Sequence, residues 1–278
     1  GKGRPRMPEW PEMEHYRRRL GDLVCGVHIT EAVVHQPRAI NTEPEEFDRA
    51  LQSRRILFVE RRGKYLLFHL DDGYRLVLHL AQGGYLRHGP ERDRLDARFA
   101  VIIGFTDGNR LFFRIPASGF LHWMPAKAAA ESLRFLGPEP FDPRLDENAF
   151  AGALGGGRGI LRLALANQRI IAGIGGRYAD EICHQAGISP LAMPADLPLE
   201  ARRGLFRAMR LVLQEAVDTG GCMDKPLHEG DGLTGGYRAL LRVHEREGQA
   251  CPRCGGTIRR ETISSRHVYY CPECQKSG

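Results

Sequence analysis

Four cysteines near the C-terminus constrain the fold of this chain more than any other feature. Cys251 and Cys254 form one C-x2-C pair, Cys271 and Cys274 form another, and residues 255–270 separate the two pairs. Two close pairs on tight turns let four thiolates converge tetrahedrally on a single zinc ion, and four protein ligands leave no open position for chemistry. We therefore predict one structural Zn²⁺ on these cysteines rather than redox-active disulfides.

The residues between the two cysteine pairs predict a small basic hairpin. β-rich runs at 257–263 and 267–270 form its two strands, with the ligand turns at its base. The hairpin carries the basic side chains Arg259, Arg260, Arg266 and His267. Zinc ribbons of this kind occur in many unrelated nucleic-acid proteins, so the ribbon alone does not indicate an activity.

The distribution of charge points to a polyanionic partner. The formal net charge is +6, and basic residues cluster at Arg17–Arg19, between Arg54 and Lys64, and in the C-terminal ribbon. Each phosphate that such a side chain neutralises releases condensed counterions, which favours nucleic-acid binding. Charge alone leaves an ordinary solvated surface open as the alternative.

Length and composition predict two domains and no membrane segment. The chain has 278 residues, of which 42% are hydrophobic, enough for a buried core. No apolar run approaches the roughly 18 residues of a spanning helix, and the basic stretch Gly1–Arg6 is not followed by the apolar part of a secretory signal. A cytoplasmic, nucleoid-associated location is therefore expected.

The hydrophobic pattern changes along the chain. Pro11–Leu20 predicts a short helix, because proline suits the first helical turn and the acidic residues lie at its positive end. Residues 24–120 are rich in short strands and turns, which favours an antiparallel sandwich. The predicted strands are Ile56–Glu60, Tyr65–Leu70, Leu76–Leu80, Phe99–Phe105 and Arg110–Ile115.

The proline-rich segment Leu136–Pro143 marks a boundary, after which the hydrophobic period becomes helical. The predicted helices are Ile160–Leu165, Tyr178–Ala186 and Leu199–Thr219. The glycine-rich loop Ala172–Tyr178 opens the second of them. Taken alone, this loop is a weak signal that could also mimic a nucleotide-binding turn.

In order and spacing these motifs resemble the formamidopyrimidine-DNA glycosylase and endonuclease VIII family. Met7–Glu14 is similar to its opening Met-Pro-Glu-x-Pro-Glu-x-Glu, and Arg61–Leu67 to its lysine-bearing turn. Leu136–Pro140 is similar to its interdomain segment, and Asn167–Glu181 to its helix–two-turn–helix. The four-cysteine ribbon with Arg266 completes a resemblance that covers nearly the whole chain.

The resemblance implies an α+β multidomain fold: an N-terminal antiparallel β-sandwich, a helical helix–two-turn–helix domain and a C-terminal four-cysteine zinc ribbon. DNA is expected in the cleft between the two halves. The predicted division is 1–6 as an extension or tag remnant, 7–130 as the catalytic domain, 131–142 as a linker, 143–246 as the helical DNA-binding domain and 247–276 as the zinc hairpin.

The resemblance also implies the chemistry of a bifunctional DNA glycosylase and AP lyase. In the family a proline at the free chain end attacks C1′ of a damaged nucleotide and becomes an iminium ion, which allows β- and δ-elimination. Carried over, Pro8 is the nucleophile and Glu9 shuttles protons. Glu12 would support the site, and Lys64 would bind a phosphate or assist proton transfer. The damaged nucleotide must first leave the base stack.

A set of DNA contacts follows from the same resemblance. Arg266 would grip the phosphates that flank the lesion, and the glycine-rich loop would present backbone N–H groups to the DNA backbone. The candidate DNA-binding residues are Gln82, Arg87, Gly175, Gly176, Arg177, Tyr178 and Arg266. The expected partner is damaged duplex DNA, with single strands as a further candidate, and the expected state is a monomer.

The start of the chain departs from the family pattern. Seven residues precede Pro8, and a peptide-bonded proline nitrogen is an amide whose lone pair is delocalised into the carbonyl. We interpret residues 1–6 as an extension, with Met7 as the natural initiator. If the extension is native, a non-catalytic or lyase-poor damage-binding paralogue is the alternative. A zinc-ribbon transcription or translation factor would leave the N-terminal motif unexplained.

Other departures concern the residues that fill the gap left by the extruded base. Gln82 stands where the family often has Met, and Ala117 and Gly119 replace Arg and Phe in a second loop. Gly176 replaces a phosphate-binding Asn, and the segment Cys222–Gly236 differs in composition. These changes argue against a standard 8-oxoguanine enzyme and favour oxidised pyrimidines, ring-opened purines, abasic sites, or lesions in single strands or crosslinks.

Overall fold

The computed structural model describes residues 6–90 and 98–277; the predicted extension therefore lies outside the described residues except for Arg6. The chain divides into two compact units. The first comprises residues up to Arg134 together with Val217–Gly236, and the second comprises Phe135–Ala216 and the residues from Tyr237 onward. The domains proposed from the sequence run consecutively along the chain, whereas here residues 217–236 pack with the first unit.

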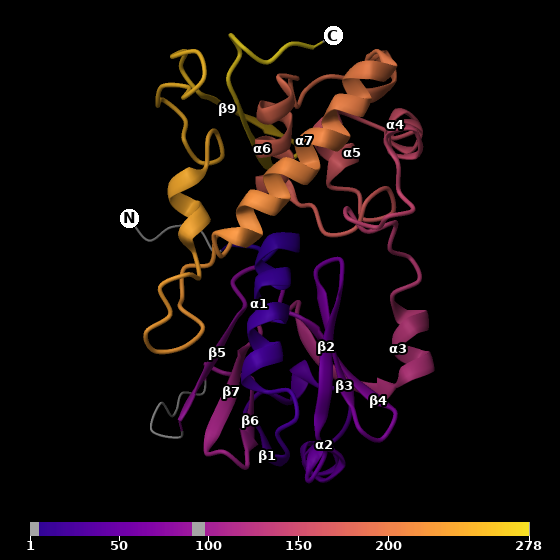
Figure 1. Cartoon of the computed structure of the whole chain (residues 1–278), viewed down its shortest axis with the longest axis vertical. Helices are drawn as coiled ribbons and strands as arrows, with labels where there is room; N and C mark the ends of the chain where they lie inside the picture. Colours follow the sequence, from indigo (N-terminus) through magenta and orange to yellow (C-terminus); the bar gives the residue numbers. More distant parts are fainter. Residues whose placement is uncertain (1–5, 91–97, 278) are drawn as a thin grey trace. The chain divides into compact units, whose positions relative to one another are not determined.

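The first unit contains two antiparallel sheets that share one hydrophobic core (Figure 1). One sheet has the order β1-β6-β7-β5, and the other has the order β2-β3-β4-β8. The strands of the first sheet are β1 Ile29–Val34, β6 Val101–Phe105, β7 Asn109–Arg114 and β5 Tyr85–Pro90. Those of the second are β2 Ile56–Arg62, β3 Tyr65–Leu70, β4 Tyr74–His79 and β8 Phe120–Pro125. The predicted antiparallel sandwich is thus confirmed.

Helices complete the first unit. The predicted N-terminal helix is confirmed as α1, which spans Trp10–Leu23 and buries Met13, Tyr16 and Leu20 completely. The shorter helices are the 3-10 helix η1 Pro37–Ala39, α2 Pro44–Leu51 and α3 Ala126–Ser132. Apolar residues of α1 and of both sheets meet in the same core, so the helix that follows Pro8 is anchored along its inner face.

The strand predictions hold for β2, β3, β4, β6 and β7; the bounds agree for β3 and shift at one or both ends for the others. Phe99 and Ala100, for example, are buried but precede β6, which begins at Val101. The sequence did not predict β1, β5 or β8. Strand β5 ends in Gly-Pro, a pair that weakens a strand pattern, and it lies at the edge of its sheet, where proline is tolerated.

The second unit contains helices and the C-terminal hairpin. Its elements are α4 Glu147–Gly155, α5 Leu161–Leu165, α6 Gly176–Ala186, the 3-10 helices η3 Pro194–Asp196 and η4 Gly236–Leu240, α7 Leu199–Asp218, β9 Arg259–Ile263 and β10 Arg266–Tyr270. The first residue of η4 and the last two of α7 belong to the first unit. The apolar stripe predicted on α7 is confirmed as core, because Leu205, Met209 and Leu213 are fully buried. Helix α6 is followed by the C-cap residue Gly187, whose left-handed φ of 72° suits glycine.

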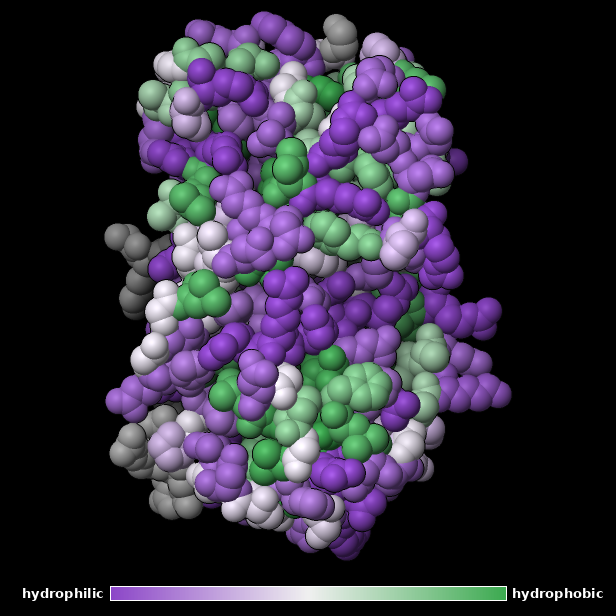
Figure 2. Space-filling view, viewed as in Figure 1, coloured by the Kyte–Doolittle hydropathy of each residue, from purple (hydrophilic) through white to green (hydrophobic). Residues whose placement is uncertain are grey.

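No helix among the described residues combines the length and apolar character needed to cross a membrane. The surface is mostly hydrophilic in the view of Figure 2. Leu57 and Phe58 on β2 are exceptions, with 45% and 51% of their surface exposed. Hydrophobic colour gathers in Figure 2 on the part of the face where Figure 1 draws β2. The ring of Phe58 is partly covered by His69, at a centroid distance of 3.9 Å.

Candidate functional site

The two glutamates of the N-terminal motif form a reciprocal cap at the start of α1. Glu9 is the N-cap residue, its side chain accepts from the backbone N–H of Glu12, and the Glu9 N–H donates to Oε1 of Glu12 at 2.8 Å. A capping box of this kind satisfies N–H groups that a helix start leaves unpaired. Pro8 is buried directly before it, so the cap also fixes the peptide that follows the candidate nucleophile.

The segment around Cys222 also forms a hydrogen bond with Glu12. Its second oxygen, Oε2, accepts from the backbone N–H of Cys222 at 3.0 Å, across 210 residues of sequence. Gly221 has a φ of 65°, and a Cβ placed there would lie 2.6 Å from Oε2, so a side chain at this position would collide with Glu12. Glu12 is completely buried. Both of its carboxylate oxygens therefore accept backbone hydrogen bonds, one from Glu9 and one from Cys222.

Lys64 lies half-buried on the turn between β2 and β3, and the neighbouring Arg61 ties this turn to α1. The Nε of Arg61 donates to Oε1 of Glu14 at 2.9 Å, while its Nη1 donates to the carbonyl of Gly63 at 3.2 Å. The guanidinium also stacks over the ring of Trp10, 4.6 Å from the centroid. The side chain of Arg61 thus fixes the backbone beside Lys64 relative to α1, whose N-cap is Glu9.

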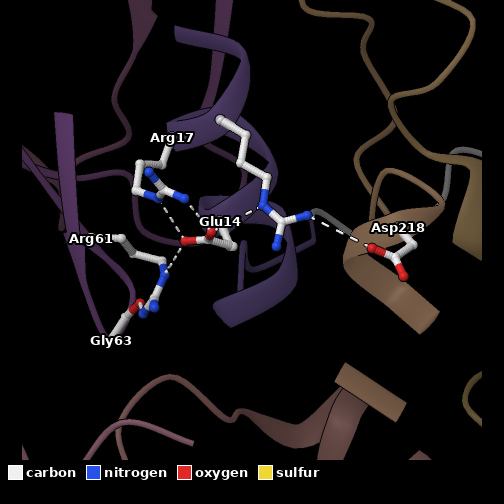
Figure 3. A network of polar contacts seen from close by, with 6 residues as sticks. Glu14, Arg17, Arg61, Gly63 and Asp218 are labelled. Atoms are coloured by element: carbon white, nitrogen blue, oxygen red, sulfur yellow. Dashed lines mark hydrogen bonds and ion pairs between the residues drawn. The ribbon is translucent and has the colours of Figure 1, made fainter. Parts of the chain in front are cut away.

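Glu14 is the centre of this network, as Figure 3 shows. Arg17 donates two hydrogen bonds to it at 2.8 and 2.7 Å, and Arg18 donates a third at 3.1 Å while also lying 3.7 Å from Asp218. Burial raises the pKa of Glu14, but hydrogen bonds from Arg17 and Arg61 and their positive charges outweigh burial and lower it to about 2. Sequence reasoning did not single out Glu14 or Arg61, since their pairing depends on the fold.

The variant Glu14→Gln is expected to destabilise the protein in a pH-dependent way. The pKa of Glu14 is about 2 against an ordinary 4.5, so its stabilising contribution is complete above pH 4.5 and is lost as the pH falls toward 2. Because Arg17 and Arg18 are partly exposed, we expect a loss of about 1–2 kcal/mol at pH 7. The measurement is denaturant unfolding of both proteins at pH 7 and pH 3.5.

The matched control for this prediction is Glu200→Gln. Glu200 also pairs with arginines, Arg207 at 2.7 Å and Arg203 at 3.6 Å, but it is exposed and its removal should have little effect. A stability difference between Glu14→Gln and the parent that stays constant from pH 7 to pH 3.5 would contradict the assignment of a buried, ionised carboxylate.

His79 is a candidate that sequence reasoning missed, although it directly precedes the turn that contains Gln82. Burial and the charge of Lys64 lower the pKa of His79, so the imidazole is neutral at physiological pH. Its ring stacks on Tyr65 at a centroid distance of 5.0 Å, and its Nδ1 is buried with no hydrogen-bond partner among the described residues. His79 thus lies beside Lys64 with a polar atom available to a ligand.

The turn between β4 and β5 carries Gln82 at an exposed position. The N–H of Gly83 donates to the carbonyl of Arg6 at 2.9 Å, so this turn contacts the backbone of Arg6. Arg87, the other candidate in this region, is half-buried on β5 opposite Phe112. The structure therefore places Gln82 on a turn that contacts Arg6, and Arg87 on an edge strand.

The second loop that departs from the family pattern, residues 115–120, packs tightly against the start of the turn that contains Gln82. A Cβ at Gly119 would lie 2.6 Å from the carbonyl oxygen of His79 and 2.9 Å from that of Leu80. The guanidinium of Arg38 binds the same loop by donating to the carbonyls of Ile115 and Pro116 at 2.7 and 3.1 Å. A large side chain at position 119 would require backbone movement, so the packing leaves no room there for a phenylalanine.

The four patterned cysteines meet in the second unit as a metal site. Their sulfur atoms all lie within 4.8 Å of one another, with Cys251–Cys274 at 3.8 Å and Cys254–Cys271 at 3.5 Å. Zn–S bonds of about 2.3 Å in a tetrahedron place the sulfurs roughly 3.8 Å apart, so the cluster fits zinc. The other cysteines, Cys25, Cys183 and Cys222, lie outside the cluster.

The hairpin held by this cluster presents Arg266 as the exposed first residue of β10. The turn before it is formed by Ser264 and Ser265, both with positive φ. On the helical side Gly175 is the N-cap of α6, and Gly176, Arg177 and Tyr178 form its first turn. Arg177 and Tyr178 are almost completely buried, which leaves the backbone of this turn as their expected contribution to a ligand.

Comparisons with known proteins cover almost the whole chain. Residues 7–116 match the formamidopyrimidine-DNA glycosylase N-terminal domain, residues 136–225 match the formamidopyrimidine-DNA glycosylase H2TH domain, and residues 248–276 match the zinc finger found in FPG and IleRS. A formamidopyrimidine-DNA glycosylase of Pelotomaculum thermopropionicum is 36% identical over 275 residues, which cover 97% of this chain and 99% of that protein. The chain belongs to the formamidopyrimidine-DNA glycosylase family.

Other members of the family agree in sequence and in structure. The Thermus thermophilus enzyme is 38% identical over 278 residues, covering 98% of this chain and 100% of its own. A crystal structure of MutM (FPG) protein from Thermus thermophilus covers 96% of this chain and 98% of its own with a TM-score of 0.85 at 34% identity. A Lactococcus lactis Fpg in complex with DNA that contains an abasic site reaches a TM-score of 0.89 at 27% identity, covering 96% and 99%.

The comparisons confirm the family, the fold class and the zinc site predicted from the sequence. The match to the FPG zinc finger and the geometry of the cysteine cluster together identify a single structural Zn²⁺. All four of its ligands belong to the chain, so the ion shapes the hairpin and takes no part in chemistry.

Proposed function

We propose that this chain is a base-excision repair enzyme that removes oxidised or ring-opened bases from DNA and then cuts the strand. The observation that carries the proposal is the buried arrangement of Pro8, Glu9 and Glu12 at the start of α1, with the Lys64 turn tied to the same helix. Family membership supports the glycosylase activity, and the AP lyase step rests on the amine chemistry of Pro8.

The chemistry begins with the nitrogen of Pro8 in a chain that starts at this residue. Its secondary amine is substantially neutral near pH 8 and attacks C1′, whereupon the bond from C1′ to the base breaks. Opening of the sugar at O4′ leaves an iminium ion between Pro8 and C1′. That cation accepts electrons when a C2′ proton is removed, so the 3′ phosphate leaves by β-elimination and the 5′ phosphate follows by δ-elimination.

Other residues of the first unit are proposed to transfer protons, to fix the backbone and to bind DNA. Glu9 passes protons to the departing base and to O4′, and Glu12 fixes the Glu9 backbone. Lys64 binds a phosphate near the lesion or assists proton transfer, on a turn that the pairing of Arg61 with Glu14 keeps in place. Gln82 and Arg87 are proposed to contact the DNA around the extruded nucleotide.

The second unit is proposed to hold the DNA backbone. The first turn of α6, from Gly175 to Tyr178, offers backbone N–H groups at the positive end of the helix, and Arg266 offers a guanidinium on the zinc hairpin. The proposed substrate is damaged duplex DNA, with single strands as a further candidate, bound by a monomer. We place the protein in the cytoplasm in association with the nucleoid.

The lesion preference follows from the residues that are absent. With Ala117 and Gly119 at the two positions that depart from the family pattern, the loop has neither an arginine to read the opposite base nor a wedge at these positions. We therefore propose ring-opened purines, oxidised pyrimidines and abasic sites as substrates in preference to 8-oxoguanine. A panel of lesion oligonucleotides measures this preference directly.

The variant Glu9→Gln tests the proposal. In protein that begins at Pro8 we expect base excision to slow by about 10²–10⁴-fold, because the amide cannot shuttle protons. The capping acceptor is retained by the amide oxygen, so binding to an abasic-analogue duplex should change little. Single-turnover excision on the lesion panel and fluorescence anisotropy measure the two effects.

The matched control is Glu43→Gln, which changes the exposed N-cap residue of α2 in the same way. It should leave excision unchanged. Full excision by the Glu9 variant would remove Glu9 from the mechanism. If the parent protein binds the damaged duplex but excises nothing, the damage-binding paralogue is the correct description.

A further inference from the structure

A buried arginine fills the space that the side chain of residue 176 would occupy. Gly176 is the first residue of α6, and a Cβ built on it would lie 2.0 Å from Nη2 of Arg162 and 2.9 Å from its Cζ. No side chain at position 176 could coexist with Arg162 in this conformation. The guanidinium of Arg162, which projects from α5, therefore stands where another residue at the start of α6 would place its own polar group.

Arg162 is charged, buried and poorly satisfied. Only 6% of its surface is exposed, and neither Nε nor Nη1 has a hydrogen-bond partner among the described residues. Nη2 donates to the carbonyl of His267 at 3.5 Å, the long limit of a hydrogen bond. A guanidinium has five N–H donors, and leaving a buried charge with one weak contact costs stability. A buried guanidinium with unpaired donors is suited to binding an anion.

The neighbouring helix end increases the need for negative charge. Helix α6 starts beside this guanidinium, and its N-cap Gly175 has no side chain with which to cap it. The N-terminus of a helix carries a partial positive charge, so a cation placed there is unfavourable unless an anion binds to both. The carboxylate of Asp180, further along α6, already accepts from Nδ1 of His244 at 2.8 Å.

We propose that Arg162 binds a phosphodiester group of the DNA backbone at the first turn of α6, in place of a side chain at Gly176. The proposal rests on the function proposed above and deepens it by naming the residue that supplies this contact. The guanidinium offers the planar fork of donors that matches phosphate oxygens, and the first-turn N–H groups complete the site. The contact with His267 also places Arg162 next to the strand that begins with Arg266.

The competing explanation is that Arg162 only holds α5 against the zinc hairpin through His267. The two explanations differ in salt dependence and in thermal stability. A phosphate contact contributes about one unit to the slope of log affinity against log salt concentration, whereas a structural contact contributes none. Removing a structural contact lowers the melting temperature, whereas removing a buried charge that lacks partners leaves it unchanged or raises it.

The first experiment uses Arg162→Gln and Arg162→Leu in protein that begins at Pro8. The probe is a duplex with a tetrahydrofuran abasic analogue, and its binding is followed by anisotropy over a series of KCl concentrations. We expect affinity at low salt to fall about tenfold and the salt slope to fall by about one. The melting temperature should not decrease. Arg162→Lys, which keeps the charge, should retain most of the slope.

Arg202→Gln is the matched control. Arg202 likewise occupies the space that a side chain at a glycine would need, because a Cβ built on Gly155 would lie 2.1 Å from its Nη1. Unlike Arg162, however, Arg202 uses this Nη1 to donate to the carbonyl of Ala151 at 2.6 Å. This arginine is engaged by its own chain, so its loss should leave the salt slope unchanged. Equal loss of slope in both variants would overturn the proposal.

The second experiment moves the polar group from position 162 to position 176. Gly176→Asn alone should weaken binding, since the new side chain collides with Arg162. The double variant Gly176→Asn with Arg162→Gln should bind more tightly than either single variant, because the amide then takes the place of the guanidinium. Wild-type affinity and slope in Arg162→Gln, or a lower melting temperature with an unchanged slope, would overturn the inference alone. Failure of the parent protein to bind the abasic duplex would overturn the proposed function as well.

Discussion

Protein whose chain begins at Pro8 is expected to cut an abasic-site duplex at least about 10³-fold faster than protein that keeps residues 1–7. Removing the nucleophile of an enzyme with covalent catalysis costs this much or more, and in the longer chain the nitrogen of Pro8 is an amide whose electron pair is delocalised. The measurement is strand incision on denaturing gels under single-turnover conditions, with both proteins at the same concentration.

Two controls separate chemistry from folding in this comparison. The longer chain gains contacts of its own, since Arg6 lies 3.4 Å from Asp224 and its carbonyl accepts from Gly83, so melting temperatures and DNA affinities must be compared as well. Pro11→Ala alters another proline at the start of α1 without touching the amine, and it should retain most of the activity. Equal incision by the long and short chains would contradict the amine mechanism.

Zinc removal is expected to have the second largest effect, on DNA binding rather than on chemistry. The hairpin has a very small core, made of Val243, Cys251, Ile258, Tyr269 and Cys271. A core of this size cannot hold two five-residue strands together, so the metal supplies the folding free energy of the ribbon. Without it Arg266 loses its fixed position. We expect Cys271→Ser to weaken binding to an abasic-analogue duplex about 100-fold, as for the loss of two phosphate contacts.

The measurements for the zinc prediction are metal content, by release of zinc to a chromogenic chelator, and duplex affinity by anisotropy. Cys25→Ser is the control, because Cys25 is a partly buried thiol in the first unit and outside the metal cluster. It should keep zinc and affinity. A zinc-free Cys271→Ser protein that binds the duplex as tightly as the parent would show that the hairpin has no part in DNA binding.

Local patterns allowed much of the fold to be predicted. The cysteine spacing defines the metal site completely, because two C-x2-C turns leave one way for four thiolates to converge. The runs at β2, β3 and β7 have enough β-branched and aromatic residues, bounded by turn signals, to be recognised alone. Strand β5 could not be recognised in this way, since its Gly89 and Pro90 are tolerated only because the strand lies at a sheet edge.

The supports of the candidate site could not be predicted, because they join residues that are distant in sequence. The bond from Cys222 to Glu12 spans 210 residues, and that from Arg61 to Glu14 spans 47. Sequence reasoning identified Glu12 only through a family resemblance and gave no reason for its role. The structure shows its contacts: Glu12 accepts a hydrogen bond from the N–H of Glu9 and another from that of Cys222.

The departures from the family pattern are also explained in part by packing. The sequence shows that Gly119 and Gly176 replace larger residues, but not what fills the vacated space. Backbone carbonyls close on Gly119, and the guanidinium of Arg162 occupies the side-chain position of Gly176. At position 119 the backbone leaves no space for a larger side chain, whereas at position 176 a guanidinium occupies that space.

In the proposed mechanism the amine of Pro8 forms a covalent bond to deoxyribose, and locating that bond tests the mechanism. Protein that begins at Pro8 is incubated with abasic-site DNA, reduced with borohydride, digested and analysed by tandem mass spectrometry. The sugar adduct should be found on the N-terminal peptide, at the nitrogen of Pro8. An adduct on Lys64, or efficient strand incision with no adduct on either residue, would show that Pro8 is not the nucleophile.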